Sequence, residues 1–407
     1  MKNFRCFGEA ELKLRYPDDQ DGGDSPLPNV NLILGDNGGG KSSVLRAVAV
    51  TVLAPVLLRS GFVAYRMVRR PNVQRSELAV EITLDAIERN SQPAGATMTL
   101  SASLEARPKQ SLDLLLAGPS GEAITEPLFD DFSPSFFMVG YGATRRVETG
   151  DFSESSARRS RGLRYQRVAG LFEDHVAVRP LEAWLRKLSP DVLRQALKML
   201  QRVLPDNIKF DGTFDPNEDQ YIFRFEGRDT PFSALSDGYK AFIGMAGDLI
   251  GHLADCCPPH ARLDELPGIV LVDEIDLHLH PAWQRSILPT LARAFPRLQF
   301  ICTTHSPLVA SAVHKENVFV TAADDNGLAT IKQIKERVYG RNAEQLLLSS
   351  YFGLDSTRPD SFKDEAKDLF KEAAEGNAKA ALQYLDKLAA PAVEARRDLG
   401  MDEGKPA

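Results

Sequence analysis

Residues 29–42 contain the feature that most constrains the fold of this chain. The apolar run NVNLIL leads into GDNGGGKS at 35–42, and a second apolar stretch continues from Val44 to Leu58. The pattern G-x-x-x-x-G-K-S in this setting predicts a buried strand, a loop whose backbone N–H groups point inward, and a helix that begins near Lys41. Glycine is required there because side chains would block the approach of a phosphate group. The segment therefore predicts an α/β protein with a phosphate-binding loop.

Two side chains of this phosphate loop, which runs from Gly35 to Ser42, have expected roles. We expect Lys41 to reach the β- and γ-phosphates of a nucleotide and the Ser42 hydroxyl to ligate Mg²⁺. The start of the helix contributes its dipole and its free N–H groups. The alternative, a glycine-rich turn beside a surface lysine, leaves the flanking strand and helix unexplained. ATP and Mg²⁺ are therefore the expected ligands.

A second apolar run ends in a pair of carboxylates. In IVLVDEIDLHLHP, strand-like residues from 269 to 272 lead directly into Asp273 and Glu274. We expect Asp273 to hold Mg²⁺ through water, and Glu274 to act as the general base or to orient the attacking water. The alternative is an acidic turn in which Asp276 caps a helix.

Two shorter motifs flank this carboxylate pair (Asp273 and Glu274). Ser236 and Gly238 stand in a Leu-Ser-Asp-Gly turn before a predicted helix, 37 residues ahead of Asp273, which is a second anion-binding geometry. His305, in ICTTHSP, follows another apolar run and lies 32 residues beyond Asp273. That spacing leaves room for one helix and a returning strand, so we expect His305 to emerge beside the carboxylate pair.

The remaining pattern divides the chain into four segments. Residues 1–145 hold the phosphate loop and antiparallel strands, and residues 146–206 hold an exposed loop rich in arginine and serine with a helical insert at 168–204. Residues 207–320 hold a hairpin and the last three motifs, and residues 321–407 hold short strands and a helical tail, a candidate partner-binding region. A first strand or hairpin is expected over 3–14.

Composition narrows the function classes. A net charge of −7 argues against a uniformly basic nucleic-acid binder, and no apolar stretch reaches the roughly 20 residues of a membrane span. His278 and His280 lie two residues apart, but no third ligand follows in a fitting zinc pattern. Reduced thiols in the cytoplasm are expected, since none of the cysteines shows metal-site spacing. These cysteines are Cys6, Cys256, Cys257 and Cys302.

The motifs in this order, with NFRCF at 3–7, resemble the ABC-type ATPase heads of the RecF and SMC group over residues 1–60, 136–146 and 207–320. GDNGGGKSS, LSDG, DEIDLHLHP and TTHSP are most similar to compact ATPases of bacterial anti-phage defence, such as the Septu ATPase subunit and retron-linked ATPases. The resemblance implies an ABC-ATPase head with a mixed, largely parallel core sheet, an antiparallel β lobe and a small helical subdomain.

The resemblance also implies roles for single residues. His305 would sense the γ-phosphate, and with Lys41 and Glu274 it would make up the catalytic set of an ATP hydrolase. Nucleotide binding would fall to Gly35, Asp36, Asn37, Gly38, Gly39, Gly40, Lys41, Ser42 and Ser43. The signature residues, which would contact ATP bound to a second protomer, are Ser236, Asp237 and Gly238. The glutamine loop of the group has no convincing counterpart: Tyr141 to Arg145 occupies its place, and Gln166 is a candidate.

Such heads dimerise head to tail around ATP, so the resemblance implies a homodimer or a higher homo-oligomer. Two functions follow as hypotheses. The first is a defence ATPase whose ATP-driven dimerisation senses infection or gates a separately encoded effector, which this resemblance implies to be a nuclease. The alternative is a RecF-like repair clamp on duplex DNA, with contacts from Arg158, Arg159, Arg161 and Arg164. A transporter motor is not favoured, because 232 residues separate Lys41 from Asp273.

Overall fold

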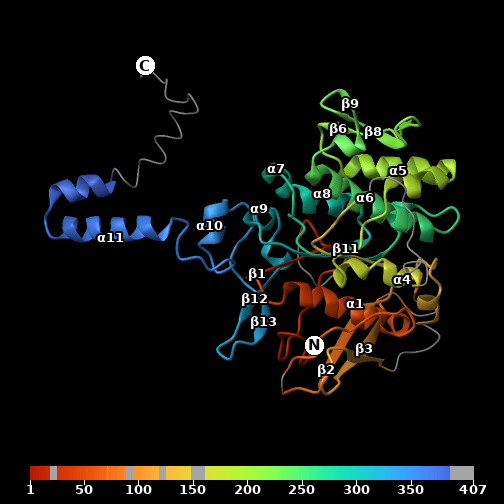
Figure 1. The fold of residues 1–407 in the computed structure, drawn as a ribbon, viewed down its shortest axis with the longest axis horizontal. Helices are drawn as coiled ribbons and strands as arrows, with labels where there is room; N and C mark the ends of the chain where they lie inside the picture. The colour runs from red at the N-terminus through yellow and green to blue at the C-terminus, as the bar shows by residue number, and fades with distance from the viewer. Residues whose placement is uncertain are drawn as a thin grey trace. The chain divides into compact units, whose positions relative to one another are not determined.

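The computed structural model describes residues 1–18, 25–70, 72–88, 93, 95–118, 125–147 and 161–385. The chain forms two compact units (Figure 1). The first unit comprises Met1–Leu346 and Ser350–Phe352, and the second comprises Leu347–Ser349 and Gly353–Ala407. The first three segments expected from the sequence all lie in the first unit.

A six-stranded sheet lies at the centre of the first unit, in the order β13-β12-β1-β11-β10-β5. Every neighbouring pair runs parallel except β12 and β13, which confirms the expected mixed, largely parallel core sheet. The strands are β1 (Val30–Gly35), β5 (Met138–Tyr141), β10 (Gly268–Val272), β11 (Leu298–Thr303), β12 (Val318–Ala323) and β13 (Ala329–Gln333).

The register of this sheet brings the motifs to one edge. Ile33 of β1 pairs with Thr303 of β11, and Val272 of β10 pairs with Tyr141 of β5. The carboxyl ends of β1, β11, β10 and β5 therefore lie side by side, and we call this the site edge. In parallel sheets ligands bind outside the carboxyl ends of the strands, so the fold directs attention to this edge.

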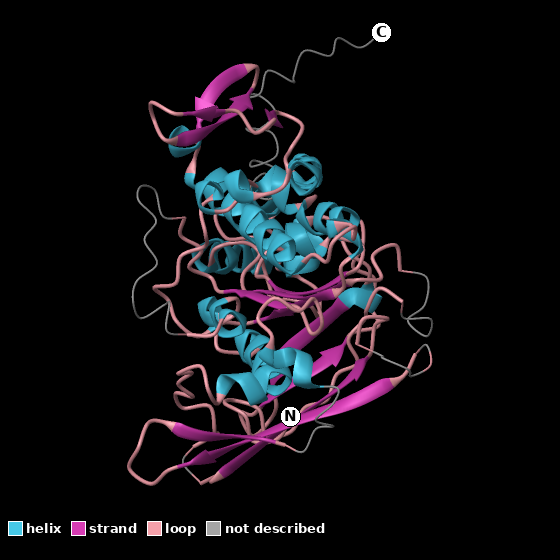
Figure 2. Cartoon of the chain, turned by 90° about the vertical axis from the view of Figure 1, so that its right-hand side faces the viewer, coloured by secondary structure: helices cyan, strands magenta, loops and turns pink. Residues whose placement is uncertain are grey.

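Both faces of the central sheet are buried, which explains its continuous apolar runs. On one face lies α1 (Lys41–Leu57), which is covered on its far side by the antiparallel strands β2 (Arg75–Thr83), β3 (Thr97–Ala106) and β4 (Asp113–Ala117) (Figure 2). Because two sheets enclose it, α1 buries 14 of its 17 residues, as expected of a helix without a polar face.

The other face is covered by α5 (Pro190–Val203), α6 (Asp237–Cys256) and α8 (Ile287–Ala294). Alternate residues of β1 serve the two cores: Leu32 and Leu34 point to this side, and Ile33 points to α1. A set of short antiparallel strands packs beyond these helices. They are β6 (Ile208–Lys209), β7 (Phe214–Asp215), β8 (Gln220–Phe225) and β9 (Arg228–Pro231).

The remaining described elements are short. They are α4 (Leu163–Gln166), α7 (Pro281–Gln284), α9 (Pro307–Ala310), α10 (Ala343–Leu347), and the 3₁₀ turns Glu126–Phe129, Ala169–Leu171, Leu181–Ala183, Leu185–Lys187, Phe232–Ala234, Leu263–Glu265 and Lys315–Asn317. In the second unit, α11 (Asp360–Ala374) and a helical stretch at 378–385 lie where the sequence predicted a helical tail. No helix among the described residues is long and apolar enough to cross a membrane.

Two expectations about secondary structure were wrong. Residues 3–14 form isolated bridges and no strand, because Asn3 and Arg5 both adopt positive φ angles, of 53° and 49°, that interrupt an extended chain. The helical insert is also shorter than the pattern over 168–204 suggested. Between residues 169 and 187 the chain forms only short 3₁₀ turns, two of them directly after Pro180, and the next α-helix begins at Pro190.

Candidate active site

The phosphate loop closes around its own lysine. The Lys41 ammonium group donates hydrogen bonds to the carbonyl oxygens of Gly35, at 2.8 Å, and Asp36, at 2.9 Å. The side chain is buried, and this burial lowers the pKa of Lys41, while the negative charges of Asp273 and Glu274 oppose the shift. Lys41 and the carboxylate pair are far apart in sequence, but β1 and β10 both flank β11 and end at the same site edge, which brings them to it.

Glycine is a geometric necessity at two positions of the loop. Gly35 has a φ of +142°, and a Cβ atom there would lie 2.2 Å from the Thr321 hydroxyl oxygen. Gly40 has a φ of +96°, and its Cβ would lie 2.6 Å from the ring of Phe7. At Gly38 a Cβ would meet no atom within 4 Å, so the loop backbone is open on that side. The residues present fit a nucleotide phosphate approaching the backbone.

The carboxylate pair directly follows β10 and is held by Thr303 at the end of β11. The Thr303 hydroxyl donates to Asp273 Oδ1 at 2.6 Å and accepts the N–H of Glu274 at 2.8 Å. The N–H of Asp273 donates to the Tyr141 carbonyl at 2.8 Å. Glu274 adopts a φ of +49°, in the left-handed region that a non-glycine residue enters only when its surroundings enforce it.

Arg145 helps to hold the Glu274 backbone in this left-handed conformation. It lies in the segment after β5, and its Nη2 donates to the Glu274 carbonyl oxygen at 2.5 Å. Burial lowers the pKa of Arg145, and the neighbouring acidic groups oppose this shift. The sequence showed only that Tyr141 to Arg145 fills the place of a glutamine loop, and it did not reveal this contact. Gln166 lies in α4, and its side-chain amide donates to the Arg161 carbonyl at 2.8 Å.

His305 follows the end of β11 by two residues, at the site edge, and its side chain is partly exposed. The residues on either side of it are fixed. Thr304 donates a hydrogen bond to Asp276 Oδ1, and the Ser306 hydroxyl caps α9. Asp276 is therefore held by this threonine, and it caps no helix.

Of the two histidines beyond the carboxylate pair, His280 has a structural role. His280 Nδ1 accepts the N–H of Ala282, at 3.3 Å, and caps α7. Among the described residues no group of three or more His, Cys, Asp and Glu side chains is arranged to hold a metal ion. All four cysteines are free thiols.

The signature turn stands at the start of α6. Ser236 and Asp237 are exposed, and Asp237 pairs with Lys240 at 2.9 Å, a hydrogen bond that lowers the pKa of the carboxyl group. Gly238 packs so closely that a Cβ would lie 2.2 Å from the His278 carbonyl oxygen. This glycine lets the start of α6 touch the segment that follows the carboxylate pair.

The four arginines expected to contact DNA differ in their surroundings. Arg158 and Arg159 lie outside the described residues. Arg161 pairs with Glu173 at 2.6 Å. The expectation for Arg164 was wrong: its side chain is buried, 1% exposed, and its guanidinium group donates to five backbone carbonyl oxygens. Because this cage satisfies the buried guanidinium group, Arg164 is not available to a DNA phosphate.

Phosphate loop, carboxylate pair, histidine and signature turn on this mixed α/β fold are the parts of a P-loop ATPase site. Comparison with known proteins gives its relatives. Residues 149–311 match the family described as "AAA domain, putative AbiEii toxin, Type IV TA system", and residues 1–53 match a second AAA domain family.

Among curated proteins the chain is similar to a Septu protein PtuA of Bacillus mycoides, with 28% identity over 329 residues, 81% of this chain and 41% of that protein. It is 33% identical over 162 residues to the Retron Vc95 probable ATPase of Vibrio cholerae, covering 38% of this chain and 31% of that protein. It is also 29% identical over 137 residues to the Old nuclease of Escherichia phage P2, and this match covers 33% of this chain and 22% of that protein. The chain thus spans less than half the length of these three relatives.

Solved structures that match include an Smc head domain with an extended coiled coil from Pyrococcus furiosus, with 13% identity and a TM-score of 0.47. The match covers 82% of this chain and 94% of that one. An SMC head domain from Thermotoga maritima gives 15% identity and a TM-score of 0.43. That match covers 82% of this chain and 97% of the other.

Proposed function

We propose that this chain hydrolyses ATP in bacterial anti-phage defence, and that ATP-driven dimerisation of two copies gates a separate effector. One observation carries the ATPase part of the proposal: Lys41 and the carboxylate pair face the same site edge, with Thr303 bridging both carboxylate residues. Similarity to a Septu protein and to a retron ATPase supports the defence role.

The residues divide the chemistry among them. Lys41 would neutralise the β- and γ-phosphates, and Glu274 would accept the proton of the attacking water or orient that water. Mg²⁺ held between Ser42 and Asp273 would add charge neutralisation at the phosphates when bound. His305 would contact the γ-phosphate. Thr303 and Arg145 would keep the Glu274 backbone in one conformation through the contacts on either side of it.

A second copy of the chain would complete the site. Ser236 and Asp237 are exposed at the start of a 20-residue helix, where free N–H groups and the helix dipole favour an anion. Because Ser236 makes no capping hydrogen bond with its own helix, its hydroxyl remains free to contact ATP held by the partner. Head-to-tail pairing of this kind would bury two nucleotides in one dimer.

The tail in the second unit supports a role for a separate effector. Helix α11 buries none of its 15 residues, and it carries an exposed Phe370. Leu382 and Leu385 of the following helical stretch are also exposed. Exposed apolar side chains of this kind suit contact with a partner protein, and we assign the effector-binding role to this tail.

The decisive experiment compares Glu274→Gln with Lys41→Ala. Glu274→Gln should bind ATP, accumulate a dimer in sedimentation velocity, and lose at least about 100-fold in hydrolysis, since a positioned base contributes that much. Lys41→Ala should lose nucleotide affinity and remain monomeric with ATP. If Glu274→Gln turned over ATP at the normal rate, the role of Glu274 would be wrong.

The separation between ATPase and effector is tested directly. The purified chain with ATP, Mg²⁺ or Mn²⁺, and plasmid DNA should leave the DNA intact. Metal-dependent cleavage by this chain alone would refute the division of labour, and similarity to a phage nuclease makes the test necessary. For the alternative function, a clamp on duplex DNA, a salt titration with a non-hydrolysable ATP analogue is decisive, because phosphate contacts weaken steeply with salt.

A further inference from the structure

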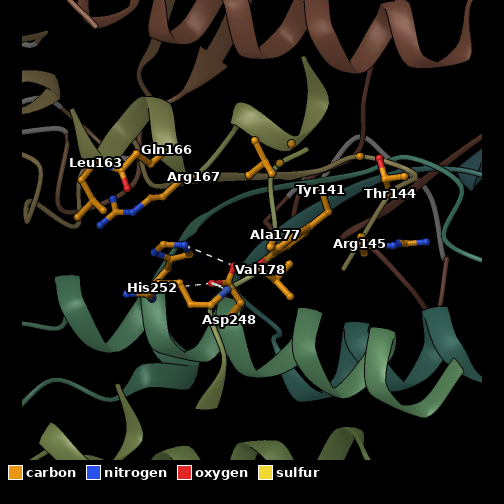
Figure 3. Close-up of a pocket in the computed structure, with 15 residues that line it drawn as sticks. Tyr141, Thr144, Arg145, Leu163, Gln166, Arg167, Ala177, Val178, Asp248 and His252 are labelled. Carbon is orange, nitrogen blue, oxygen red and sulfur yellow. Dashed lines mark hydrogen bonds and ion pairs between the residues drawn. The ribbon is translucent and has the colours of Figure 1, made fainter. Parts of the chain in front are cut away.

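A pocket lies behind the end of β5, on the side of the sheet covered by α6 (Figure 3). Its walls come from the segment after β5, from α4 and the turn that follows it, from residues 176–179, and from α6. Glycines bring the walls together: a Cβ at Gly142 would lie 2.0 Å from the Gly170 carbonyl oxygen. We call this the arginine pocket, after Arg145, Arg167 and Arg179 in its lining.

One carboxylate in the arginine pocket is fully satisfied. Asp248 accepts hydrogen bonds from the Tyr141 hydroxyl at 2.9 Å and from the backbone and Nε of Arg179 at 3.1 and 3.2 Å. His252 Nε2 lies 3.4 Å from the same carboxylate. Arg179 also pairs with Asp255, which is not part of the lining, at 2.9 Å. The anionic side of the pocket is therefore already balanced.

In the part of the chain that the structure describes, the positive charge of Arg167 has no carboxylate hydrogen-bonded to it. Its side chain is buried, 2% exposed, and only its Nη2 is bonded, to the Asp131 carbonyl at 3.0 Å and the Cys256 thiol at 3.0 Å. Its Nε and Nη1 atoms have no hydrogen-bond partner among the described residues, and neither do Arg179 Nη2 and His252 Nδ1. A buried guanidinium group that has no carboxylate partner and keeps unpaired N–H groups is costly unless another group supplies the missing acceptors.

We propose that the arginine pocket binds a small anion bearing a phosphate group, with Arg167 as the residue that anchors it. The lining carries three guanidinium groups against the single carboxylate of Asp248, and a phosphate oxygen accepts the forked donors of arginine. Burial lowers the pKa of His252 to about 4, so His252 stays neutral at pH 7 and its Nδ1 is left to accept a hydrogen bond from a protonated phosphate oxygen.

The position of the pocket links it to the ATPase site. Tyr141 lines the pocket, and its carbonyl accepts the N–H of Asp273. Arg145 lies on the opposite side of the pocket from Arg167 in Figure 3 and bonds to the Glu274 carbonyl. One wall of the pocket is thus the segment that holds the backbone of the carboxylate pair, so a bound anion would stabilise that segment.

The test uses a chain whose phosphate loop cannot compete for the probe. In full-length Lys41→Ala protein, inorganic phosphate at tenfold over its Kd should raise the unfolding midpoint by about 2 °C relative to chloride at equal ionic strength. Adding Arg167→Lys should abolish most of that shift, because lysine lacks the fork of donors. The control Arg194→Lys, at an exposed residue 72% accessible, should leave the shift unchanged. Because nucleotide binding is disabled, the outcome is independent of the proposed ATPase function.

Two further experiments test which phosphate compound binds and where it binds. Adenosine monophosphate in place of inorganic phosphate shows whether a phosphate ester is preferred over the free ion. Crystals of Lys41→Ala protein soaked in tungstate should show an anomalous peak at Arg167, a readout that does not require the Arg167 variant to fold. Absence of any phosphate-specific shift together with no peak at Arg167 would overturn the proposal, and so would a shift that persists in the Arg167→Lys chain.

Discussion

Thr303 offers the sharpest test of how the site edge works. Its hydroxyl donates to Asp273 Oδ1 at 2.6 Å and accepts the Glu274 N–H at 2.8 Å, and the side chain is fully buried. Thr303→Val keeps the shape but removes both bonds. The lost hydrogen bond to a charged carboxylate is worth about 1.5–3 kcal/mol, and the orphaned N–H costs about 1–3 kcal/mol.

The lost hydrogen bond to Asp273 and the unpaired N–H of Glu274 should show in different measurements. If the bond to the carboxylate is needed to hold the transition state, its loss lowers kcat about 10- to 150-fold at saturating ATP. The orphaned N–H of Glu274 lowers the free energy of unfolding and frees the strained backbone. We therefore expect Thr303→Val to bind ATP with nearly normal affinity and to hydrolyse it slowly, measured by phosphate release under single-turnover and steady-state conditions.

Two controls separate this mechanism from a general loss of packing. Thr303→Ser keeps the hydroxyl and should retain most of the activity. Thr51→Val removes a buried hydroxyl in α1 that only donates to the Ala47 carbonyl at 2.6 Å, a group already paired within the helix, so activity should hardly change. A Thr303→Val chain with kcat within twofold of the parent would refute the reasoning.

Three further predictions follow from the surroundings of the site. Arg145→Met removes the bond to the Glu274 carbonyl and should lower kcat at least about tenfold with little change in ATP affinity, measured by steady-state hydrolysis and nucleotide titration. Gly238→Ala places a Cβ 2.2 Å from the His278 carbonyl oxygen and should lower the free energy of unfolding by about 1–3 kcal/mol in a denaturant titration. Burial lowers the pKa of His252 to about 4, so between pH 6.5 and 4 the unfolded chain binds more protons than the folded chain. The free energy of unfolding should therefore fall as the pH falls through this range. His252→Asn should make that pH dependence weaker in thermal unfolding.

Each of these has a matched comparison. Arg145→Lys keeps the charge and should recover part of kcat, whereas a loss equal to that of Arg145→Met would indicate a requirement for the guanidinium fork. Gly162→Ala adds a Cβ no closer than 3.8 Å to any atom and should be nearly neutral. A pH dependence in the His252→Asn chain as steep as in the parent would contradict the assignment of the acid-sensitive term to His252.

The phosphate loop and the sheet were readable from sequence because each rests on short-range chemistry. A glycine pattern between a strand and a helix requires a particular backbone at Gly35 and Gly40, and the structure shows the positive φ angles that only glycine accepts easily. Continuous apolar runs at 29–34, 268–272 and 298–303 indicated strands buried on both faces. Parallel order then follows, because such strands are joined by helices and end at one edge.

The surroundings of the arginine side chains could not be predicted from the sequence in the same way. In the sequence Arg161 and Arg164 belong to one polar, arginine-rich stretch, which suggested a surface for DNA, and Arg145 stands just before that stretch. In the structure Arg164 lies in a cage of carbonyl groups, Arg161 pairs with Glu173, and Arg145 reaches a residue 129 positions away. Whether a charged side chain is solvated, caged or directed at a site depends on which distant backbone surrounds it.

The order of residues along the chain was enough to predict the core of a P-loop ATPase, because the loop, the carboxylate pair, the histidine and the signature turn stand in local patterns whose spacing indicates one sheet edge. How that edge is held together depends on the folded chain. The bridge through Thr303, the bond from Arg145 to the Glu274 carbonyl, and the close approach of Gly238 to His278 all join residues far apart in the chain. Contacts of this kind depend on packing across elements, which the order of residues along one strand or helix does not specify.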